Sequence, residues 1–241
     1  MTTYIAMWSG PRNISTALMR AWENRADTFV HDEPFYGHYL KVTGFDHPGA
    51  DEIIAHEETD WRKIVTQITS PPPNGAAIYY QKHMTHHLLD HMTRDWLSEV
   101  TNCFLIREPS LVLISLAKKL ADVTIEQTGI PQQAALFHEV RAQTGTIPPV
   151  IDARDVLLDP RRVLAQLCER VGAPFDEAML SWPAGPRESD GVWAKYWYAS
   201  VEKSTGFEPY QERDESVPGH LRHMLDACNA LYAELAQYRL T

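Results

Sequence analysis

The stretch "YIAMWSGPRNISTALMRAW", residues 4–22, is the part of this 241-residue chain that decides the fold. The apolar run Tyr4–Trp8 predicts a buried strand, "SGP" predicts a turn, and the spacing after it predicts a helix that opens at Ser15 and Thr16. The first N–H groups of a helix are unpaired and its dipole is positive at that end, so such a junction binds anions well. Arg12, Ser15 and Thr16 add donors. We therefore expect an anion at this turn, although a junction without any ligand remains an alternative.

The junction departs from the loop that binds ATP in P-loop enzymes. That loop reads GxxxxGK[ST], whereas the frame that begins at Gly10 lacks both the second glycine and the lysine. Because that lysine and a Mg²⁺ ligand are central to phosphoryl transfer, ATP or GTP chemistry is disfavoured here.

The rest of the chain repeats the pattern of an apolar run followed by helical spacing, which predicts parallel βαβ units. We expect an α/β fold of three layers, a mostly parallel sheet flanked by helices, with a helical C-terminal extension, in a single domain over residues 1–241. In such sheets ligands bind outside the carboxyl ends of the strands. The expected strands are Tyr4–Trp8, Phe29–His31, Ala77–Gln81, Cys103–Ile106 and Pro149–Asp152, and the expected helices include Ser15–Asn24, Trp61–Ile68, His86–Ser98, Leu111–Leu120 and Arg161–Val171. The last of these is punctuated by Asp159 as N-cap, Pro160 in the first turn and Gly172 just past the end.

Composition and charge narrow the classes of partner. The formal net charge is −10 and the pI is near 5.5, which argues against binding to nucleic acid or an anionic membrane. The cysteines Cys103, Cys168 and Cys228 are scattered and form no CxxC motif, which indicates a reducing compartment, and we expect the cytoplasm. We expect neither a signal peptide at "MTTYIAMW" nor a transmembrane helix.

A second strand-to-helix junction carries another cation. In "CFLIREPSLVLIS", Arg107 follows the strand at the place where an NTPase would carry an acidic Mg²⁺ ligand, and Ser115 lies eight residues later. Asp152 is a weaker candidate for that acidic residue. An ion pair between Arg107 and a neighbour such as Glu108 is the alternative reading.

Taken together, the two junctions resemble the sulfotransferases that use 3′-phosphoadenosine-5′-phosphosulfate (PAPS). Their first loop reads roughly [KR]-S-G-[ST]-[ST], so Arg12 matches the basic position and Ser15 and Thr16 match the hydroxyl pair, while Asn13 and Ile14 depart from Ser-Gly. Glycine lets the backbone approach a phosphate closely, so Ile14 is the larger departure. The family's second loop carries an Arg and, eight residues later, a Ser, as here. "DARDVLLDPRRVLAQLCERVGAP" also resembles a later segment of the family, and the resemblance covers residues 4–175.

The resemblance implies a P-loop NTPase-like fold and in-line transfer of a sulfonate group, without a metal, to a hydroxyl or amine of a small-molecule or carbohydrate acceptor. Arg12 would stabilise the phosphosulfate during transfer, and Arg107 and Ser115 would hold the 3′-phosphate. A C-terminal loop of the family folds over the nucleotide, and Trp193, Lys195 and Lys203 are candidates for this role, although Trp193 also fits a core aromatic. The full set of expected cofactor-binding residues is Gly10, Arg12, Asn13, Ile14, Ser15, Thr16, Arg107, Ser115, Trp193 and Lys195.

Two residues are candidates for the base that deprotonates the acceptor. Glu33, in "HDEPFYGHY", resembles the base of carbohydrate sulfotransferases, and it is our preferred candidate. Lys82 and His83, in "YYQKHMTHH", resemble the K-T-H stretch of small-molecule sulfotransferases, in which the His is the base. His87 and His91 have the spacing of a helical metal pair, but no third ligand is evident, so we expect no metal.

Three other functions stay open on the sequence. A Mg²⁺-dependent nucleotide kinase fits the strand–loop–helix start and Asp152. A non-catalytic nucleotide-binding protein on the same fold fits Asn13 and Ile14. A pyridoxal-phosphate enzyme or the partner of an aminotransferase is the third, although no lysine has a suggestive context. The aromatic C-terminal third offers a surface for a homodimer.

Overall fold

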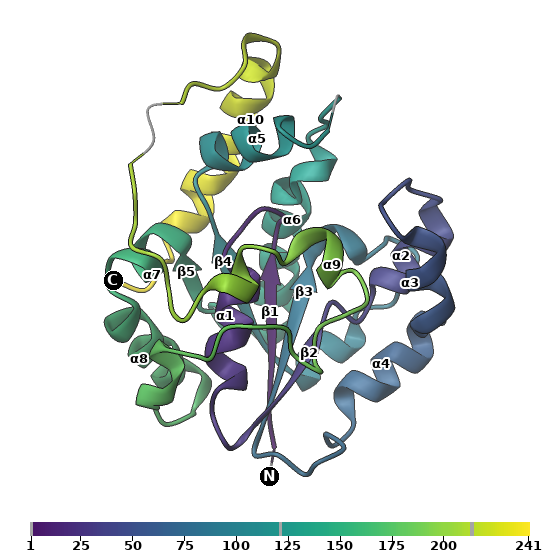
Figure 1. The fold of residues 1–241 in the computed structure, drawn as a ribbon, viewed down its shortest axis with the longest axis vertical. Helices are drawn as coiled ribbons and strands as arrows, with labels where there is room; N and C mark the ends of the chain where they lie inside the picture. Colours follow the sequence, from purple (N-terminus) through teal and green to yellow (C-terminus); the bar gives the residue numbers. More distant parts are fainter. Residues whose placement is uncertain (1, 121, 213–214) are drawn as a thin grey trace.

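The computed structural model describes residues 2–120, 122–212 and 215–241. At its centre lies a five-stranded sheet in the order β2-β3-β1-β4-β5, in which every pairing is parallel (Figure 1). β1 is central, so the loop after it opens at the middle of the carboxyl edge. The strands are β1 (Thr3–Ser9), β2 (Thr28–Asp32), β3 (Ile78–Met84), β4 (Thr101–Ile106) and β5 (Val150–Asp152).

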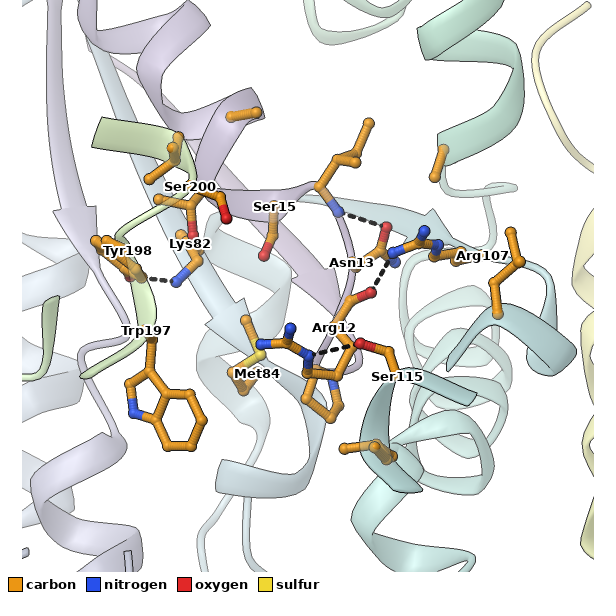
Figure 2. Close-up of a pocket in the computed structure, with 18 of the residues that line it drawn as sticks. Arg12, Asn13, Ser15, Lys82, Met84, Arg107, Ser115, Trp197, Tyr198 and Ser200 are labelled. Carbon is orange, nitrogen blue, oxygen red and sulfur yellow. Dashed lines mark hydrogen bonds between the residues drawn. The ribbon is translucent and has the colours of Figure 1, made fainter. Parts of the chain in front are cut away.

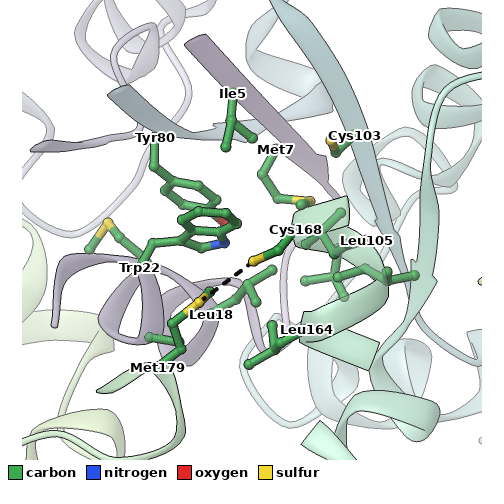
Figure 3. Close-up of a cluster of buried hydrophobic side chains, with 14 of the residues drawn as sticks. Ile5, Met7, Leu18, Trp22, Tyr80, Cys103, Leu105, Leu164, Cys168 and Met179 are labelled. Atoms are coloured by element: carbon green, nitrogen blue, oxygen red, sulfur yellow. Dashed lines mark hydrogen bonds between the residues drawn. The ribbon is translucent and has the colours of Figure 1, made fainter. Parts of the chain in front are cut away.

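Helices cover both faces of the sheet, which confirms the predicted three layers. Ile5 and Met7 of β1 lie in one buried cluster with side chains of α1 and α8 (Figure 3), whereas Ala6 and Trp8 lie in the other with those of α4 and α6. This alternation follows from the period of two in a strand. The helices are α1 (Ser15–Glu23), α2 (Tyr36–Thr43), α3 (Ala50–His56), α4 (Trp61–Thr69), α5 (Pro109–Ala117), α6 (Ile130–Thr144), α7 (Ala153–Leu158), α8 (Pro160–Val171), α9 (Ala194–Trp197) and α10 (Arg222–Ala236).

Most of the predicted helices are confirmed, including the punctuation of α8. The side chain of Asp159 accepts a hydrogen bond from the Arg162 N–H, and Gly172 ends the helix in the left-handed region. The C-terminal helix α10 packs against α5 and α6. No helix within the described ranges is long and apolar enough to cross a membrane.

The helix predicted over His86–Ser98 is wrong. Two short 3₁₀ turns, Thr85–His87 and Asp95–Glu99, take its place. The backbone leaves the helical region at Leu88, whose φ is −85° and ψ is 87°. Thr85 donates a hydrogen bond to the carbonyl of Gly129 at 2.9 Å, which fixes the start of this segment against the loop before α6.

β3 also runs further than predicted, because it includes Lys82, His83 and Met84. Successive side chains of a strand point to opposite faces. Lys82 and His83 therefore lie on opposite sides of the sheet.

A long connection, residues 181–210, returns across the sheet between α8 and α10; we call it the strap (Figure 1). Its two ends meet, since the Trp182 N–H donates to the Thr205 carbonyl at 3.1 Å. Asp190 of the strap forms an ion pair with Arg20 of α1 at 2.6 Å, and both side chains are almost fully buried. This pair fixes the strap to the first helix.

Candidate functional site

The loop after β1 holds its shape through its own side chains. The side-chain oxygen of Asn13 accepts a hydrogen bond from the Ile14 N–H at 2.9 Å, and its amide donates to the Leu105 carbonyl at 3.1 Å. Arg12 has a φ of 59°, which is the left-handed region that non-glycine residues seldom adopt. The first turn of α1 follows with no side chain capping its N–H groups. These donors, with the hydroxyls of Ser15 and Thr16, face the cavity described below.

The two junctions predicted from the sequence meet in space (Figure 2). The Arg12 Nε donates to the Ser115 hydroxyl oxygen of α5 at 2.9 Å. Arg107, just past β4, donates through Nη1 to the Arg12 carbonyl at 2.5 Å. The structure thus brings Arg12, Arg107 and Ser115 into one cationic, donor-rich corner.

Gly10 and Ile14 of the loop both pack against other parts of the protein. A Cβ at Gly10 would lie 2.4 Å from the Thr128 carbonyl oxygen, so Gly10 allows close packing against the turn before α6. Ile14 has a φ of −89°, which any residue adopts, and its side chain packs on the core between the sheet, α1 and α8. The backbone at position 14 therefore does not require glycine.

A single cavity of about 1060 Å³ runs along the carboxyl edge of the sheet. One end is mainly basic and contains Arg12, Arg107, Ser115, Lys118, Lys119 and Arg154, together with the carboxylates of Glu108 and Asp152; the other is mainly aromatic and contains Glu33, Tyr36, Tyr39, Phe45, His47, His86, His87, Trp193, Trp197 and Tyr198. The basic end is thus a local patch on a chain whose net charge is −10.

The end that contains Glu33 holds a buried cluster of charges around Lys82. The Lys82 ammonium donates to Asp32 at 2.8 Å, to Glu33 at 2.5 Å and to the Tyr198 hydroxyl at 2.8 Å. Tyr198 in turn donates to Asp32 at 2.6 Å and accepts from the Trp193 indole at 3.2 Å. An ammonium has three protons, so all the donors of Lys82 are used within the protein. Lys82 is therefore arranged to position Glu33.

Burial and the charges of neighbouring groups shift the pKa values of Glu33 and Lys82 in opposing directions. Desolvation raises the pKa of Glu33, Lys82 lowers it and Asp32 raises it further, with a net increase. Desolvation alone would lower the pKa of Lys82, but Asp32 and Glu33 raise it well above its usual value. Lys82 is accordingly protonated, while Glu33 is a stronger base than an exposed glutamate.

The other candidates from the sequence lie in different places. His83 is 1% exposed, stacks on Trp8 on the face of β3 away from Lys82, and does not line the cavity. Trp193 lines the cavity from a buried cluster with Tyr36 and Tyr198. Lys195 lies outside the cavity lining and pairs with Glu52 at 2.5 Å.

Asp152 lines the cavity but already has two partners. Its side chain caps α7 by accepting from the Arg154 N–H at 2.8 Å, and it accepts from the Tyr232 hydroxyl at 2.5 Å. His91 pairs with His38 at 3.0 Å rather than with His87. Within residues 2–120, 122–212 and 215–241, no group of three His, Cys, Asp or Glu side chains could hold a metal ion.

Sequence reasoning missed two residues of the site. Tyr198 reaches the cluster from the strap. The aromatic stretch 193–198 indicated in the sequence that this segment could contribute to the site, but it did not indicate which residue would. Asp32, which was not singled out from the sequence, is 4% exposed and is the second carboxylate that accepts a hydrogen bond from Lys82. The sequence does contain an indication of this contact, because the carboxylates of Asp32 and Glu33 follow one predicted strand and Lys82 follows another.

The comparisons with known proteins identify the family of this chain. Residues 3–234 match the family described as "Sulfotransferase domain". The chain is 36% identical over 229 residues to the Arabidopsis thaliana proteins named branched-chain-amino-acid aminotransferase-like protein 2 and protein 1. These matches cover 95% of this chain but 40% of those relatives, so the chain spans about two fifths of their length.

Solved structures support the fold. The sulfotransferase domain of the Synechococcus PCC 7002 olefin synthase superposes with a TM-score of 0.56 at 15% identity, covering 94% of this chain and 95% of its own. A sulfotransferase from Alicyclobacillus acidocaldarius gives 0.56 at 11% identity, covering 100% of this chain and 98% of its own. The sulfotransferase domain from the curacin biosynthetic pathway gives 0.50 at 15% identity, with coverage of 95% and 98%. With its family match over nearly the whole length, this chain belongs to the sulfotransferase domain family.

Proposed function

We propose that this protein transfers the sulfonate group of PAPS to a hydroxyl or amine of a small-molecule or carbohydrate acceptor. The observation that carries the proposal is the single cavity that joins a donor-rich anion corner to a buried carboxylate. The corner suits the two phosphate-type groups of the nucleotide, and the carboxylate suits the attacking group. The family supplies the class of reaction, sulfonate transfer.

The basic end would bind the nucleotide. The first N–H groups of α1, with Arg12, Ser15 and Thr16, would hold the 5′-phosphosulfate, since a helix N-terminus and a guanidinium both favour anions. Arg107 and Ser115 would hold the 3′-phosphate. Ser115 accepts a hydrogen bond from Arg12, so its own hydroxyl proton is available to an anion. These fixed donors would stabilise the negative charge that builds on the leaving phosphate.

The carboxylate end would activate the acceptor. Glu33 takes the proton of the acceptor hydroxyl while the acceptor oxygen forms its bond to sulfur. The bond from sulfur to the phosphate oxygen breaks, and its electron pair leaves with adenosine 3′,5′-bisphosphate. Lys82 holds Oε1 of Glu33 in place. Tyr36, Tyr39 and Trp197 form the walls on which an acceptor would pack.

Binding of the nucleotide is tested by thermal-shift titration with adenosine 3′,5′-bisphosphate and, separately, with ATP and Mg²⁺. We expect a saturable shift with the bisphosphate without metal, and a much weaker one in Arg107→Ala. Lys195→Ala is the control, because Lys195 is a cation outside the cavity lining. A larger shift with ATP and Mg²⁺ would favour the kinase alternative, for which Asp152 is the acidic residue.

The role of Glu33 is tested by Glu33→Gln. We expect this variant to bind the bisphosphate with nearly unchanged affinity and to lose turnover with any acceptor that the wild type sulfonates. Full turnover in Glu33→Gln would remove Glu33 from the mechanism.

The names of the plant relatives do not change this proposal. An internal Schiff base with pyridoxal phosphate needs a lysine that can lose its proton, whereas the carboxylates hold Lys82 protonated. The buried, unpaired thiols of Cys103, Cys168 and Cys228 accord with a cytoplasmic location, which we propose with the activity.

A further inference from the structure

His87 lies in a stack of aromatic rings in the wall of the cavity. Its imidazole is 4.7 Å from the Tyr36 ring, with an interplanar angle of 7°, and 4.7 Å from the Tyr39 ring, with an angle of 27°. Tyr36 and Tyr39 are one helical turn apart on α2, so the two rings that stack with the imidazole come from the same helix. His87 is 2% exposed. A ring fixed in this way has little freedom to turn its nitrogens elsewhere.

The nitrogen that faces Glu33 has no partner. The His87 Nδ1 is buried and makes no hydrogen bond within the described residues. It lies 3.8 Å from Oε2 of Glu33, while Oε1 of the same carboxylate is engaged by Lys82 at 2.5 Å. A small rotation of the Glu33 side chain brings Oε2 within hydrogen-bond distance, as contacts in sites without substrate commonly shorten on binding. Lys82 and His87 therefore divide the two carboxylate oxygens between them.

We infer that His87, through the lone pair of Nδ1, accepts a hydrogen bond from Glu33 once Glu33 has taken the proton of the acceptor. The inference rests on the proposed function for its chemistry. The acceptor O–H bond breaks, the proton moves to Oε2 of Glu33, and protonated Glu33 then donates a hydrogen bond to the lone pair of Nδ1. His87 thus carries its own proton on Nε2. It acts on Glu33 rather than on either substrate, so it is a positioning residue that makes Glu33 a stronger base.

The surroundings of the pair favour a shared proton. Burial lowers the pKa of His87 well below its usual value and raises that of Glu33, so both shifts favour a neutral imidazole beside a protonated carboxyl group. Besides Glu33, the described groups that contact His87 or act on it electrostatically are all aromatic or basic; they are Tyr36 and Tyr39 of α2, His86 beside it, His47 of the loop before α3, Lys82 and, more remotely, His83 of β3. A neutral imidazole accepts a hydrogen bond in this setting more readily than it takes a full charge.

The test is the pKa of the Glu33 carboxyl group, measured by ¹³C NMR in wild type and in His87→Phe. The resonance is assigned by its absence in Glu33→Gln. Phenylalanine keeps a flat ring between the tyrosines but has no lone pair. A hydrogen bond to the protonated acid raises its pKa, so we expect His87→Phe to lower the pKa of Glu33 by roughly half a unit to one unit. His87→Leu should show the same sign, and it replaces His87→Phe if that variant does not fold.

The sign of the change decides the inference. A rise in the pKa of Glu33 would mean that Nδ1 donates to the carboxylate, and an unchanged pKa would mean that the two groups are not coupled; either result overturns the proposal. The matched control is His31→Phe. His31 is another desolvated imidazole, since burial lowers its pKa to about 4, but it does not line the cavity. The pKa of Glu33 should not change in this variant.

Turnover supplies a second measurement. In His87→Phe we expect the single-turnover rate with PAPS to fall about ten- to a hundredfold, while affinity for adenosine 3′,5′-bisphosphate stays within about twofold. An unchanged rate would overturn the inference. If the wild type sulfonates nothing, the proposed function fails. The change in the pKa of Glu33 still decides whether protonated Glu33 donates a hydrogen bond to His87.

Discussion

Replacing Lys82 by methionine tests the charge cluster at the centre of the site. The Lys82 side chain is 1% exposed, and those of its partners Asp32 and Glu33 are 2% and 11% exposed. Methionine preserves most of the packing volume but leaves two buried carboxylates without a counter-ion. Removing one partner of a buried ion pair costs about 3–5 kcal/mol. We expect Lys82→Met to lose about that much of the free energy of unfolding at pH 7.5, out of a typical total of roughly 5–15 kcal/mol.

The loss should depend on pH in a definite direction. Without Lys82, the remaining burial and mutual repulsion raise the pKa of both carboxyl groups in the folded state above their values in the unfolded chain. Between those two values the folded state binds more protons than the unfolded state, so its stability increases as the pH falls. Urea unfolding at pH 7.5 and pH 5.5 measures this. The difference between wild type and Lys82→Met should be smaller at pH 5.5.

Two variants distinguish the effect of leaving buried carboxylates without a counter-ion from the effect of removing any lysine. Lys195→Met removes an exposed ammonium that also pairs with a glutamate, and it should leave the unfolding midpoint unchanged. Asp32→Asn combined with Lys82→Met removes one of the stranded carboxylates, so it should be more stable than Lys82→Met alone. The reasoning is refuted if Lys82→Met is as stable as wild type at pH 7.5, or if its deficit grows as the pH falls.

Three further outcomes follow from the structure. Turnover should fall as the pH drops through the raised pKa of Glu33, because the base must be ionised; a pH–rate profile whose acid limb lies at or below the usual value for a glutamate would contradict this. Gly10→Ala should lower stability by about 1–3 kcal/mol in urea unfolding, because its Cβ would meet the Thr128 carbonyl, and a neutral effect would count against that contact. Ile14→Gly should lower stability without tightening the bisphosphate, and a clear gain in affinity in a thermal-shift titration would show that the side chain obstructs the anion.

The sequence was sufficient for those parts of the site that depend on local pattern. Arg12 and Arg107 were predicted because each follows a strand, and the carboxyl ends of parallel strands share one edge; Ser115, inside α5, was predicted from its spacing of eight residues after Arg107, as in the family that the sequence resembles. The loops that follow two neighbouring strands therefore lie close together, even if the bounds of the helices are not predicted exactly. The contacts between Arg12 and Ser115 and between Arg107 and the Arg12 carbonyl are consequences of β1 and β4 being adjacent.

The parts that were missed depend on where a strand ends or on contacts between distant segments. Three further residues at the end of β3 place Lys82 towards the cavity and His83 against Trp8, and periodicity does not fix strand ends to that accuracy. Tyr198 reaches Lys82 across 116 positions of sequence, so only the path of the strap decides its role. The helix predicted over His86–Ser98 had a suitable spacing of apolar residues, but tertiary contacts at Thr85 and the burial of His87 overrode it.

The strained residues of the backbone connect the two halves of the site. Among the described residues, Arg12 and Glu33 are the non-glycine residues with positive φ, at 59° and 43°. Each follows a strand of the sheet and each belongs to one end of the cavity, and such conformations cost of order 1–3 kcal/mol. Arg12 is held by Arg107 and Ser115, and Glu33 by Lys82, so the same contacts that order the two side chains also hold their backbones. The left-handed turn of the loop lies at Arg12, whereas Ile14 has a φ of −89°, so the backbone at position 14 has no need of a glycine.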